Sequence, residues 1–263
     1  MTARTGGGAD ALPPPRVHLC EVVRTRQVTP LVQRVTVGGP GLADFPVAGG
    51  DAFAYLLLPP AGRDVMSIGL DFDWGDVRTM PKEDRPRGAY YSVRHHRPDV
   101  QEIDLDIVQH DHGTASGWAA TAVPGDEAAL WGPRVLFALP DDAAWTLLVA
   151  DDTGVPAMLS VLEHLPADHP VVAVAEVADA DEVRHLEPGP CVVLHWARRD
   201  VGGCAIDVVR DLQLPPAPGY AWGGGEHALI RELEEIIGDV HGIDAAHRSL
   251  TAYWRRDRPT GLG

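Results

Sequence analysis

Residues 87–118 read RGAYYSVRHHRPDVQEIDLDIVQHDHGTASGW, and the fold of the first half of the chain can be predicted from this stretch. A short aromatic run, Ala89–Arg94, is followed by Ile103–His110, in which apolar residues occupy every second position. Alternation of this kind is the period of a strand with one buried face. The stretch therefore contains two strands, and the residues after them begin a helix.

The end of the stretch, residues 110–118, has the composition of a turn that leads into that helix. Gly113 lets the backbone approach a ligand closely, Thr114 or Ser116 can cap the helix, and the N–H groups that follow suit an anion. An aromatic strand edge beside a helix N-terminus fits a flat ring with a phosphate tail, as in a flavin. The simpler alternatives are a helix cap and an aromatic core strand.

Composition and charge narrow the class of protein. The chain has 263 residues, enough for two domains, and 45% of them are hydrophobic. Its formal net charge of −16 argues against nucleic acid and anionic membranes as partners. Three scattered cysteines indicate neither a disulfide framework nor a metal site. Residues 1–15 contain no apolar run, and we expect a disordered leader in a cytoplasmic protein.

From Arg16 onward the first part of the chain has the pattern of short strands separated by turns. Besides the two strands above, the predicted strands are Val17–Val23, Leu31–Val37, Phe53–Leu58 and Ala128–Trp131. Residues 61–86 show little periodicity and are predicted to form a loop over the sheet. Short strands with turn signals between them indicate a small closed antiparallel barrel, which we place at 16–138.

The second part contains near-continuous apolar runs, which are typical of parallel strands covered on both faces. The predicted strands are Trp145–Ala150, Val171–Val177, Cys191–Trp196, Tyr220–Gly223 and Leu250–Trp254, and the predicted helices are Val155–Leu165, Ile206–Leu212 and Glu226–Val240. The last helix is expected to bury Leu229, Leu233, Ile236, Ile237 and Val240. This alternation predicts an open parallel α/β sheet, which we place at 145–258.

One short segment of the second part lies where such sheets bind ligands. Gly223–Glu226 is predicted to turn from a strand into the last helix, at the carboxyl edge of the sheet. Asp151 and Asp152 follow the first strand and are most simply the N-cap of the next helix.

The aromatic strand and its turn resemble the flavin site of the siderophore-interacting protein family, in the ferredoxin-reductase-like superfamily. The family pattern is Arg-x-Tyr-(Ser/Thr)-x-Arg, then a strand ending in His, then Gly-Pro-Ala-Ser-x-Trp-Ala. The matching residues are Tyr91, Ser92, Val93, Arg94, His110, Gly113, Ala115, Ser116, Trp118 and Ala119. Thr114 replaces the proline, and Ala89 replaces the first arginine, which in the family pairs with the flavin phosphate. Arg87, two residues back on the same side of the strand, is the expected substitute.

The resemblance continues through the second part and covers about residues 16–258. Asp151, Thr153, Pro156 and Ala157 match the family segment Gly-Asp-Glu-Thr-Ala-x-Pro-Ala, while Ala150 and Asp152 replace its glycine and glutamate. Tyr220–Glu226 corresponds to Trp-x-Ala-Gly-Glu, and Ala252–Arg255 to Gly-Tyr-Trp-Arg. Several motifs in the right order are a stronger signal than any one of them.

The resemblance implies a fold of the β plus α/β class. An N-terminal antiparallel Greek-key β-barrel would bind FAD, and an open parallel α/β domain of the nicotinamide-binding type would follow it. The implied enzyme takes hydride from NADH or NADPH and reduces a ferric siderophore, releasing Fe(II). Because the flavin supplies the chemistry, no catalytic residue beyond it is expected, with Ser92 near its reactive edge. The alternative, motivated by Ala89, is a non-redox tailoring enzyme or binding protein with a degraded flavin site.

The resemblance also implies the site residues. Those expected to bind FAD are Arg87, Tyr91, Ser92, Val93, Arg94, Val108, Gln109, His110, Gly113, Thr114, Ala115, Ser116, Asp152, Thr153 and Trp254. Those expected to line a nicotinamide or substrate cleft between the domains are Gly224, Gly225, Glu226, Arg198 and Arg255. The histidines at 95, 96, 110 and 112 fit no firm metal template, so no metal site is predicted. The expected partner is a small molecule, a ferric siderophore, bound by a monomer without membrane insertion.

Overall fold

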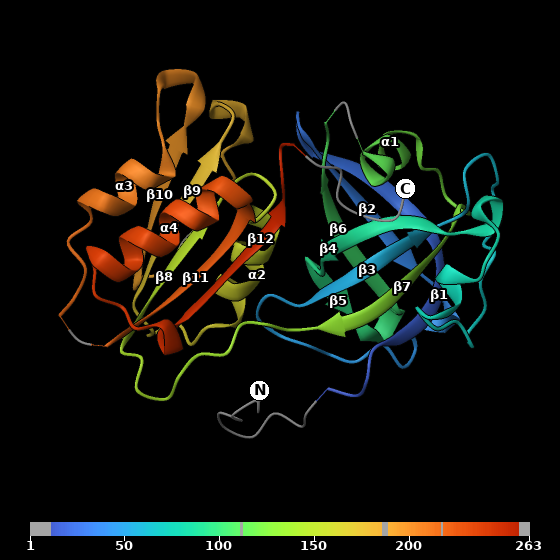
Figure 1. Ribbon diagram of the computed structural model, residues 1–263, viewed down its shortest axis with the longest axis horizontal. Helices are drawn as coiled ribbons and strands as arrows, with labels where there is room; N and C mark the ends of the chain where they lie inside the picture. The colour runs from blue at the N-terminus through green and yellow to red at the C-terminus, as the bar shows by residue number, and fades with distance from the viewer. Residues whose placement is uncertain (1–11, 111–112, 186–188, 217, 258–263) are drawn as a thin grey trace. The chain divides into compact units, whose positions relative to one another are not determined.

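The computed structural model describes residues 12–110, 113–185, 189–216 and 218–257. The chain divides into two compact units between residues 135 and 136, and each unit is described by itself (Figure 1). Most of the predicted leader, and the histidine at position 112, lie outside the described residues. Within the described ranges, none of the helices combines the length and the apolar character that crossing a bilayer requires.

The first unit is an antiparallel sheet of seven strands. In chain order they are β1 (Arg16–Thr29), β2 (Val32–Gly38), β3 (Phe53–Leu58), β4 (Arg87–Ser92), β5 (His95–Arg97), β6 (Glu102–Val108) and β7 (Glu127–Arg134). They pair in the order β4-β3-β7-β1-β2-β6-β5, and β4 also contacts β6, so the sheet curls into a barrel. Helix α1 (Thr114–Thr121) packs against β2, β4 and β6.

The alternation in β6 separates the barrel core from its polar outer face. Ile103, Leu105 and Ile107 of β6 are fully buried in the core, as predicted. Asp104 and Asp106 leave the opposite face, where they pair with arginines of neighbouring strands. Arg97 Nη2 lies 2.6 Å from Asp104 Oδ1, and Arg34 Nε lies 2.6 Å from Asp106 Oδ1. The guanidinium of Arg97, with His95 and Thr36, overcomes the effect of burial and holds the pKa of Asp104 well below its usual range.

The long connection between β3 and β4 covers one outer face of the barrel. It contains two short 3₁₀ turns, Asp76–Arg78 and Lys82–Asp84. Its Trp74 ring packs edge-on against Tyr55 and Trp131, with centroids 4.8 Å and 5.3 Å apart. The predicted loop therefore protects a second, smaller apolar cluster on the outside of the sheet.

The second unit is a parallel sheet of five strands with helices on both faces. The strands are β8 (Trp145–Ala150), β9 (Val171–Val177), β10 (Val192–Arg198), β11 (Gly219–Glu226) and β12 (Arg248–Trp254), in the order β10-β9-β8-β11-β12. Helix α2 (Val155–His164) covers one face, and α3 (Ala205–Asp211) and α4 (His227–Asp239) cover the other (Figure 1). The predicted fold class, an antiparallel barrel followed by a parallel α/β unit, is confirmed.

Three local predictions about this fold were wrong or incomplete. Gly223–Glu226 does not turn into the last helix but continues β11, and α4 begins at His227. A Cβ on Gly223 would come within 2.8 Å of the Leu233 side chain, so glycine there lets α4 pack closely on the strand. Val240 is 56% exposed because α4 ends at Asp239, and Ile230 is buried in the core instead. The short strand β5 was not predicted.

Two histidines of the barrel, the buried His18 and the half-buried His96, pack against one phenylalanine. The rings of His18 and His96 pack edge-on against Phe45, with centroids 5.0 Å and 5.4 Å from its own. Both ring nitrogens of His96 are buried, with no hydrogen-bond partner among the described atoms. Burial lowers the pKa of both histidines, although Gly41 and Asp44 partly oppose this for His18. Both rings are therefore neutral in the folded barrel near pH 7.

We expect the barrel to lose stability as the pH falls below about 6.5, the ordinary pKa of an unfolded histidine. Below that pH the unfolded chain binds protons that the buried rings resist, so each histidine costs at most about 1.4 kcal/mol per pH unit. The measurement is denaturant unfolding at about pH 7.5 and about pH 5.5, for the wild type and for His96→Phe. An equal loss of stability in both proteins would contradict the role of His96.

Candidate functional site

The aromatic strand of the quoted stretch is β4, an edge strand of the barrel sheet. Among the described strands it pairs with β3 only, with Tyr91 opposite Ala54 and Ser92 opposite Phe53. An edge strand presents backbone N–H and C=O groups that the sheet does not use. The free edge of β4 can therefore form hydrogen bonds with the rim of a planar ligand.

Side chains of β4 leave the strand on alternating faces. Arg87, Ala89 and Tyr91 share one face, and Tyr90 and Ser92 share the other. Tyr91 packs against the barrel core, and burial raises its pKa to about 12, whereas Tyr90 is 49% exposed. A single ring can touch both Tyr91 and Ser92 only at the edge of the strand.

Two arginines flank this strand. Arg87 Nε donates a hydrogen bond to the carbonyl oxygen of Pro59, 2.8 Å away, so its two Nη groups are the donors that face outward from that bond. Arg94 follows β4 and is 6% exposed, and its backbone N–H donates to Asp104 O at 2.9 Å. The register places Ala89 opposite Leu56, on the same face of β4 as Arg87. Arg87 can replace the family arginine of position 89 only if the two positions share a face, and they do.

The turn from β6 into α1 is fixed by Ser116. Ser116 Oγ accepts a hydrogen bond from the His110 backbone N–H at 2.8 Å and donates one to His110 O at 2.9 Å. The N-cap residue is Gly113, and no side chain caps the helix. The prediction that Thr114 or Ser116 caps α1 was therefore wrong, because the helix begins at Thr114 and the Ser116 hydroxyl turns back to the loop.

The residues present fit a dinucleotide with a planar ring. The N–H groups of the first helical turn have no intrahelical partner and no capping side chain, which is the arrangement that binds phosphate. Gly113 is needed because a Cβ there would collide with the His110 ring. The same helix packs against β4 and β6, so an anion site and an aromatic edge strand are neighbours. Val108 is the last residue of β6, and Gln109 follows it on the way to α1. The Gln109 N–H donates a hydrogen bond to Leu31 O at 2.7 Å.

In the second unit, Asp151 is a buried carboxylate at the end of β8 that accepts five hydrogen bonds. Its Oδ1 accepts from the backbone N–H and hydroxyl of Thr153, at 2.8 Å and 2.6 Å, and from Gly154 N–H at 3.2 Å. Its Oδ2 accepts from Glu226 N–H at 2.7 Å and from Trp254 Nε1 at 3.0 Å. The carboxylate therefore ties the turn between β8 and α2 to the ends of β11 and β12.

The glycines of β11 allow this close approach. A Cβ on Gly225 would come within 2.8 Å of Asp151 Cγ, and a Cβ on Gly224 within 2.8 Å of the Tyr253 ring. Both glycines belong to the predicted nicotinamide cleft, and the structure gives them a packing role at the carboxyl edge of the sheet. In open α/β sheets this edge, where the strand order reverses between β8 and β11, binds ligands.

The remaining predicted residues of this edge are charged. Asp152 Oδ2 lies 2.5 Å from Arg199 Nη2, and burial raises the pKa of Asp152 although Arg199 opposes the shift. Arg198 Nη2 lies 2.6 Å from Asp200 Oδ2. Arg255 follows β12 and is exposed. The predicted substrate arginines are thus exposed or half-buried, and Arg198 already has a carboxylate partner.

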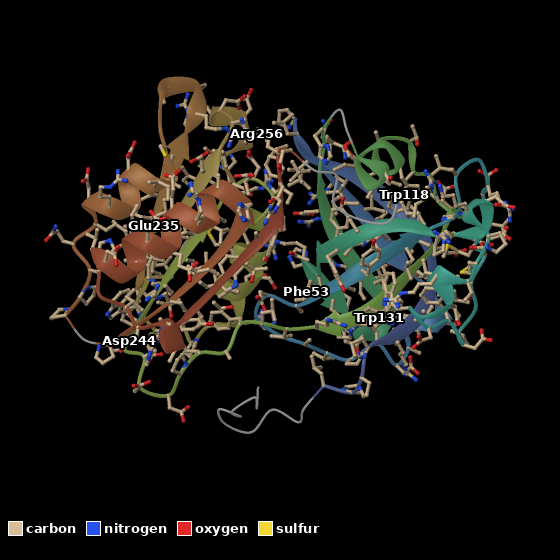
Figure 2. All side chains as sticks on the ribbon, in the orientation of Figure 1. Phe53, Trp118, Trp131, Glu235, Asp244 and Arg256 are labelled. Atoms are coloured by element: carbon tan, nitrogen blue, oxygen red, sulfur yellow. The ribbon has the colours of Figure 1, made fainter. Side chains whose placement is uncertain are left out.

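Glu226 closes the edge as the N-cap of α4. Its Oε2 accepts from Ala228 N–H at 2.5 Å, and its Oε1 accepts from the backbone N–H of Arg256 at 3.3 Å. Arg256 lies just beyond the end of β12 (Figure 2). Burial would raise the pKa of Glu226, but these backbone donors outweigh it and keep the pKa below its ordinary value. The carboxylate is therefore a structural cap and is not suited to take up a proton.

The sequence analysis missed Asp151 as the centre of this edge, because it assigned Asp151 a helix-cap role only. A local signal did exist, since an aspartate directly after a fully buried strand precedes Thr153 and Gly154. Its other two partners lie 75 and 103 residues further along the chain. Among the described residues, no three His, Cys, Asp or Glu side chains are grouped to hold a metal ion.

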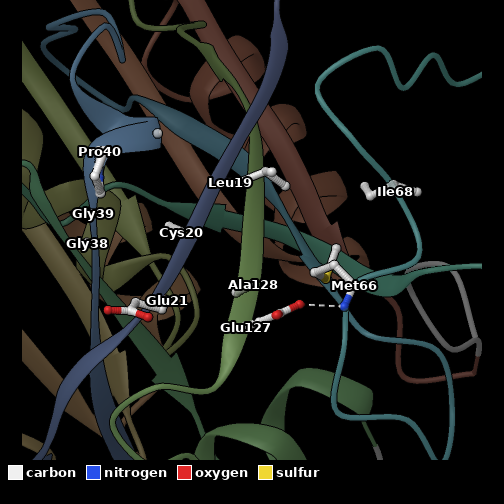
Figure 3. A pocket seen from close by; sticks show the side chains of 11 residues that line it. Leu19, Cys20, Glu21, Gly38, Gly39, Pro40, Met66, Ile68, Glu127 and Ala128 are labelled. Carbon is white, nitrogen blue, oxygen red and sulfur yellow. Dashed lines mark hydrogen bonds between the residues drawn. The ribbon is translucent and has the colours of Figure 1, made fainter.

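A cavity of about 500 Å³ lies on another part of the barrel. It is lined by Leu19, Cys20, Glu21, Gly38, Gly39, Pro40, Gly41, Met66, Ile68, Glu127 and Ala128. Figure 3 shows β1 crossing its floor, with Pro40 on one side and Met66 on the other. None of the predicted site residues lines it, so this cavity is not part of the candidate site.

Comparison with known proteins assigns the family. Residues 21–137 match the model of the siderophore-interacting FAD-binding domain, and residues 143–257 match that of the siderophore-interacting protein. The chain belongs to the siderophore-interacting protein family. The predicted family is thus confirmed, and FAD is the cofactor of the barrel unit.

Relatives cover nearly the whole chain. An uncharacterized protein of Mycobacterium tuberculosis is 33% identical over 261 residues, which cover 92% of this chain and 91% of that protein. An NADPH-dependent ferric-chelate reductase of Escherichia coli is 28% identical over 243 residues, which cover 89% of this chain and 91% of that protein. The solved structure of a siderophore utilization protein from T. fusca is 27% identical and has a TM-score of 0.81. The match covers 94% of this chain and 96% of that protein.

Proposed function

We propose that this chain is an FAD-dependent oxidoreductase that takes a hydride from NADH or NADPH and reduces the ferric ion of a siderophore. The observation that carries the proposal is an aromatic edge strand beside an uncapped helix start, within a matched FAD-binding domain. The E. coli relative, named a ferric-chelate reductase, supports the reaction class. When bound, FAD supplies hydride acceptance and single-electron transfer.

In this proposal the barrel unit binds and orients the cofactor. The first-turn N–H groups at Thr114, Ala115 and Ser116 hold the pyrophosphate, because the helix start is electropositive and its first turn contains no acidic residue. Tyr91 packs against the flavin ring. Arg87 supplies the positive charge that pairs with the phosphate, which Ala89 cannot supply. The neighbouring residues proposed to line this site are Ser92, Val93, Arg94, Val108, Gln109, His110 and Gly113.

The second unit holds the nicotinamide nucleotide at the carboxyl edge of its sheet. Asp151 does not touch the ligand in this proposal, but it positions the backbone of Gly225 and Glu226. Thr153 and Trp254 stay proposed flavin contacts. The Thr153 hydroxyl and the Trp254 indole N–H already donate to Asp151. In this proposal Thr153 therefore contacts the flavin with its methyl group, and Trp254 contacts it with the face of its indole ring.

The substrate follows from the chemistry of iron. Siderophores bind Fe(III) through hard oxygen ligands, which hold the softer Fe(II) less tightly, so reduction releases the metal. Ferric siderophores are often anionic, and the exposed Arg255 is the proposed cationic contact on the second unit, because the guanidinium of Arg198 is already paired with Asp200. Reduction of two ferric ions consumes one hydride and releases one proton.

The test begins with the colour of the purified protein. We expect flavin absorbance in the blue, present on purification or gained when FAD is added. NADH or NADPH together with a ferric siderophore should then give two Fe(II), trapped by a ferrous chelator, for each nucleotide oxidised. A colourless protein that ignores added FAD would overturn the proposal and favour the non-redox alternative.

A further inference from the structure

The carboxyl edge of the second unit contains the groups that discriminate between NADH and NADPH. In dinucleotide-binding sheets, an acid about 20 residues after the first turn accepts a hydrogen bond from the ribose 2′-hydroxyl, whereas an arginine nearby accommodates a 2′-phosphate. Glu176 has this spacing from the turn at Gly154, on β9, the strand beside β8. Its Oε2 accepts from Ala205 N–H at 2.9 Å, so the side chain is held in place.

The arginines that could take a 2′-phosphate already have carboxylate partners. Arg199 Nη2 lies 2.5 Å from Asp152 Oδ2, and its Nη1 lies 3.6 Å from Glu176 Oε1. Arg198 forms a two-point pair with Asp200, at 3.1 Å and 2.6 Å. Each guanidinium is therefore neutralised by acids that belong to the protein.

The balance of charge at this edge is negative. Asp179 and Asp181 follow β9 and act on Arg198 in addition to Asp200. Near the ends of β8, β9 and β10, Arg198 and Arg199 thus lie among the carboxylates of Asp152, Glu176, Asp179, Asp181 and Asp200, in addition to the buried Asp151. A 2′-phosphate would add up to two negative charges here, whereas a ribose hydroxyl adds a hydrogen-bond donor.

We infer that this chain uses NADH in preference to NADPH, with Glu176 as the acceptor for the ribose 2′-hydroxyl. The inference rests on the proposed function, because it concerns the nucleotide that binds at the same edge. It differs from what the name of the E. coli relative states for that protein.

Calorimetric titration with the oxidised nucleotides tests the preference without turnover. We expect NAD⁺ to bind at least about tenfold more tightly than NADP⁺, since like charges brought together in a binding site are strongly unfavourable. The fragments 5′-AMP and 2′,5′-ADP should show the same order. Tighter binding of NADP⁺ would overturn the inference but leave the proposed function intact. If neither nucleotide binds and neither NADH nor NADPH is oxidised, the proposed function fails together with the inference.

Variants of the carboxylates identify the cause. The double variant Asp152→Asn with Glu176→Gln releases Arg199, and we expect it to bind NADP⁺ about tenfold more tightly than the wild type does. Asp142→Asn is the matched control, because Asp142 is an exposed partner of His247 just before β8, at the opposite edge of the sheet. An equal change in the control, or no change in the double variant, would rule out these carboxylates as the determinant.

Discussion

Asp151→Ala is expected to lower the free energy of unfolding of the α/β unit by about 3–5 kcal/mol, because several buried donors lose their acceptor and each unsatisfied donor costs about 1–3 kcal/mol. The carboxylate is 6% exposed and accepts all five of its hydrogen bonds from groups at the strand ends. Alanine leaves the donors of Thr153, Glu226 and Trp254 without an acceptor. The measurement is denaturant unfolding followed by tryptophan fluorescence.

Two variants separate the network from a general loss of an acidic residue. Asp151→Asn keeps one acceptor oxygen but turns an NH₂ group toward donors, so we expect a loss smaller than that of alanine. Asp142→Asn removes an exposed carboxylate of the same unit and should leave the unfolding midpoint unchanged. If Asp151→Ala unfolds at the same denaturant concentration as the control, the network does not stabilise the unit.

Asp151→Ala should also weaken nucleotide binding, and by more than its loss of stability explains. Asp151 holds the backbone of Glu226 and the turn at Gly154 together, and those segments form the edge where the nucleotide is proposed to bind. Under conditions where the variant is fully folded, its affinity for a nicotinamide nucleotide should still fall. The network thus links the stability of the strand ends to the shape of the proposed site.

The architecture could be predicted because its periods are local. Alternation in β6 and the continuous apolar runs of β8 and β9 are properties of six to eight successive residues, and each identifies a strand by itself. The family motifs identified the strand β4 and the turn into α1 for the same reason. Short-range patterns of this kind need no knowledge of the partner across the fold.

Two of the errors depend on contacts that are distant in sequence, and the error about Ser116 depends on a contact within its own turn. Gly223–Glu226 has the composition of a turn, but its glycines belong to β11, where they let α4 and Asp151 pack closely against the strand. Ser116 was predicted to cap α1, yet the start of the helix is set by how His110 folds back over Gly113. The central role of Asp151 depends on Glu226 and Trp254, which no local pattern connects to it.

Ala89→Arg should raise the affinity for FAD by about ten- to a hundredfold if the flavin phosphate lacks a cationic partner in the wild type. A hydrogen bond to a charged group contributes about 1.5–3 kcal/mol, which corresponds to that range of dissociation constants. Ala89 shares its face of β4 with Tyr91 and Arg87, so an arginine there starts from the side of the strand that the cofactor is proposed to use. The measurement is a fluorescence titration of the FAD-free protein.

Arg87→Ala in the native background provides the complementary measurement. The Arg87 Nη groups can reach a ligand while Nε stays bonded to Pro59 O, and Arg87 lies about 7 Å along the strand from Ala89, which is two residues of extended chain. If Arg87 has taken over the phosphate, Arg87→Ala should lose FAD affinity by ten- to a hundredfold, about the same range, while Ala89→Arg gains little. If Ala89→Arg gains affinity for FAD and Arg87→Ala leaves that affinity unchanged, Arg87 does not bind the phosphate, and its role is the hydrogen bond to Pro59 O after β3. Failure of wild type and both variants to bind FAD would show that the flavin site has been lost, and with it the basis of the reductase proposal.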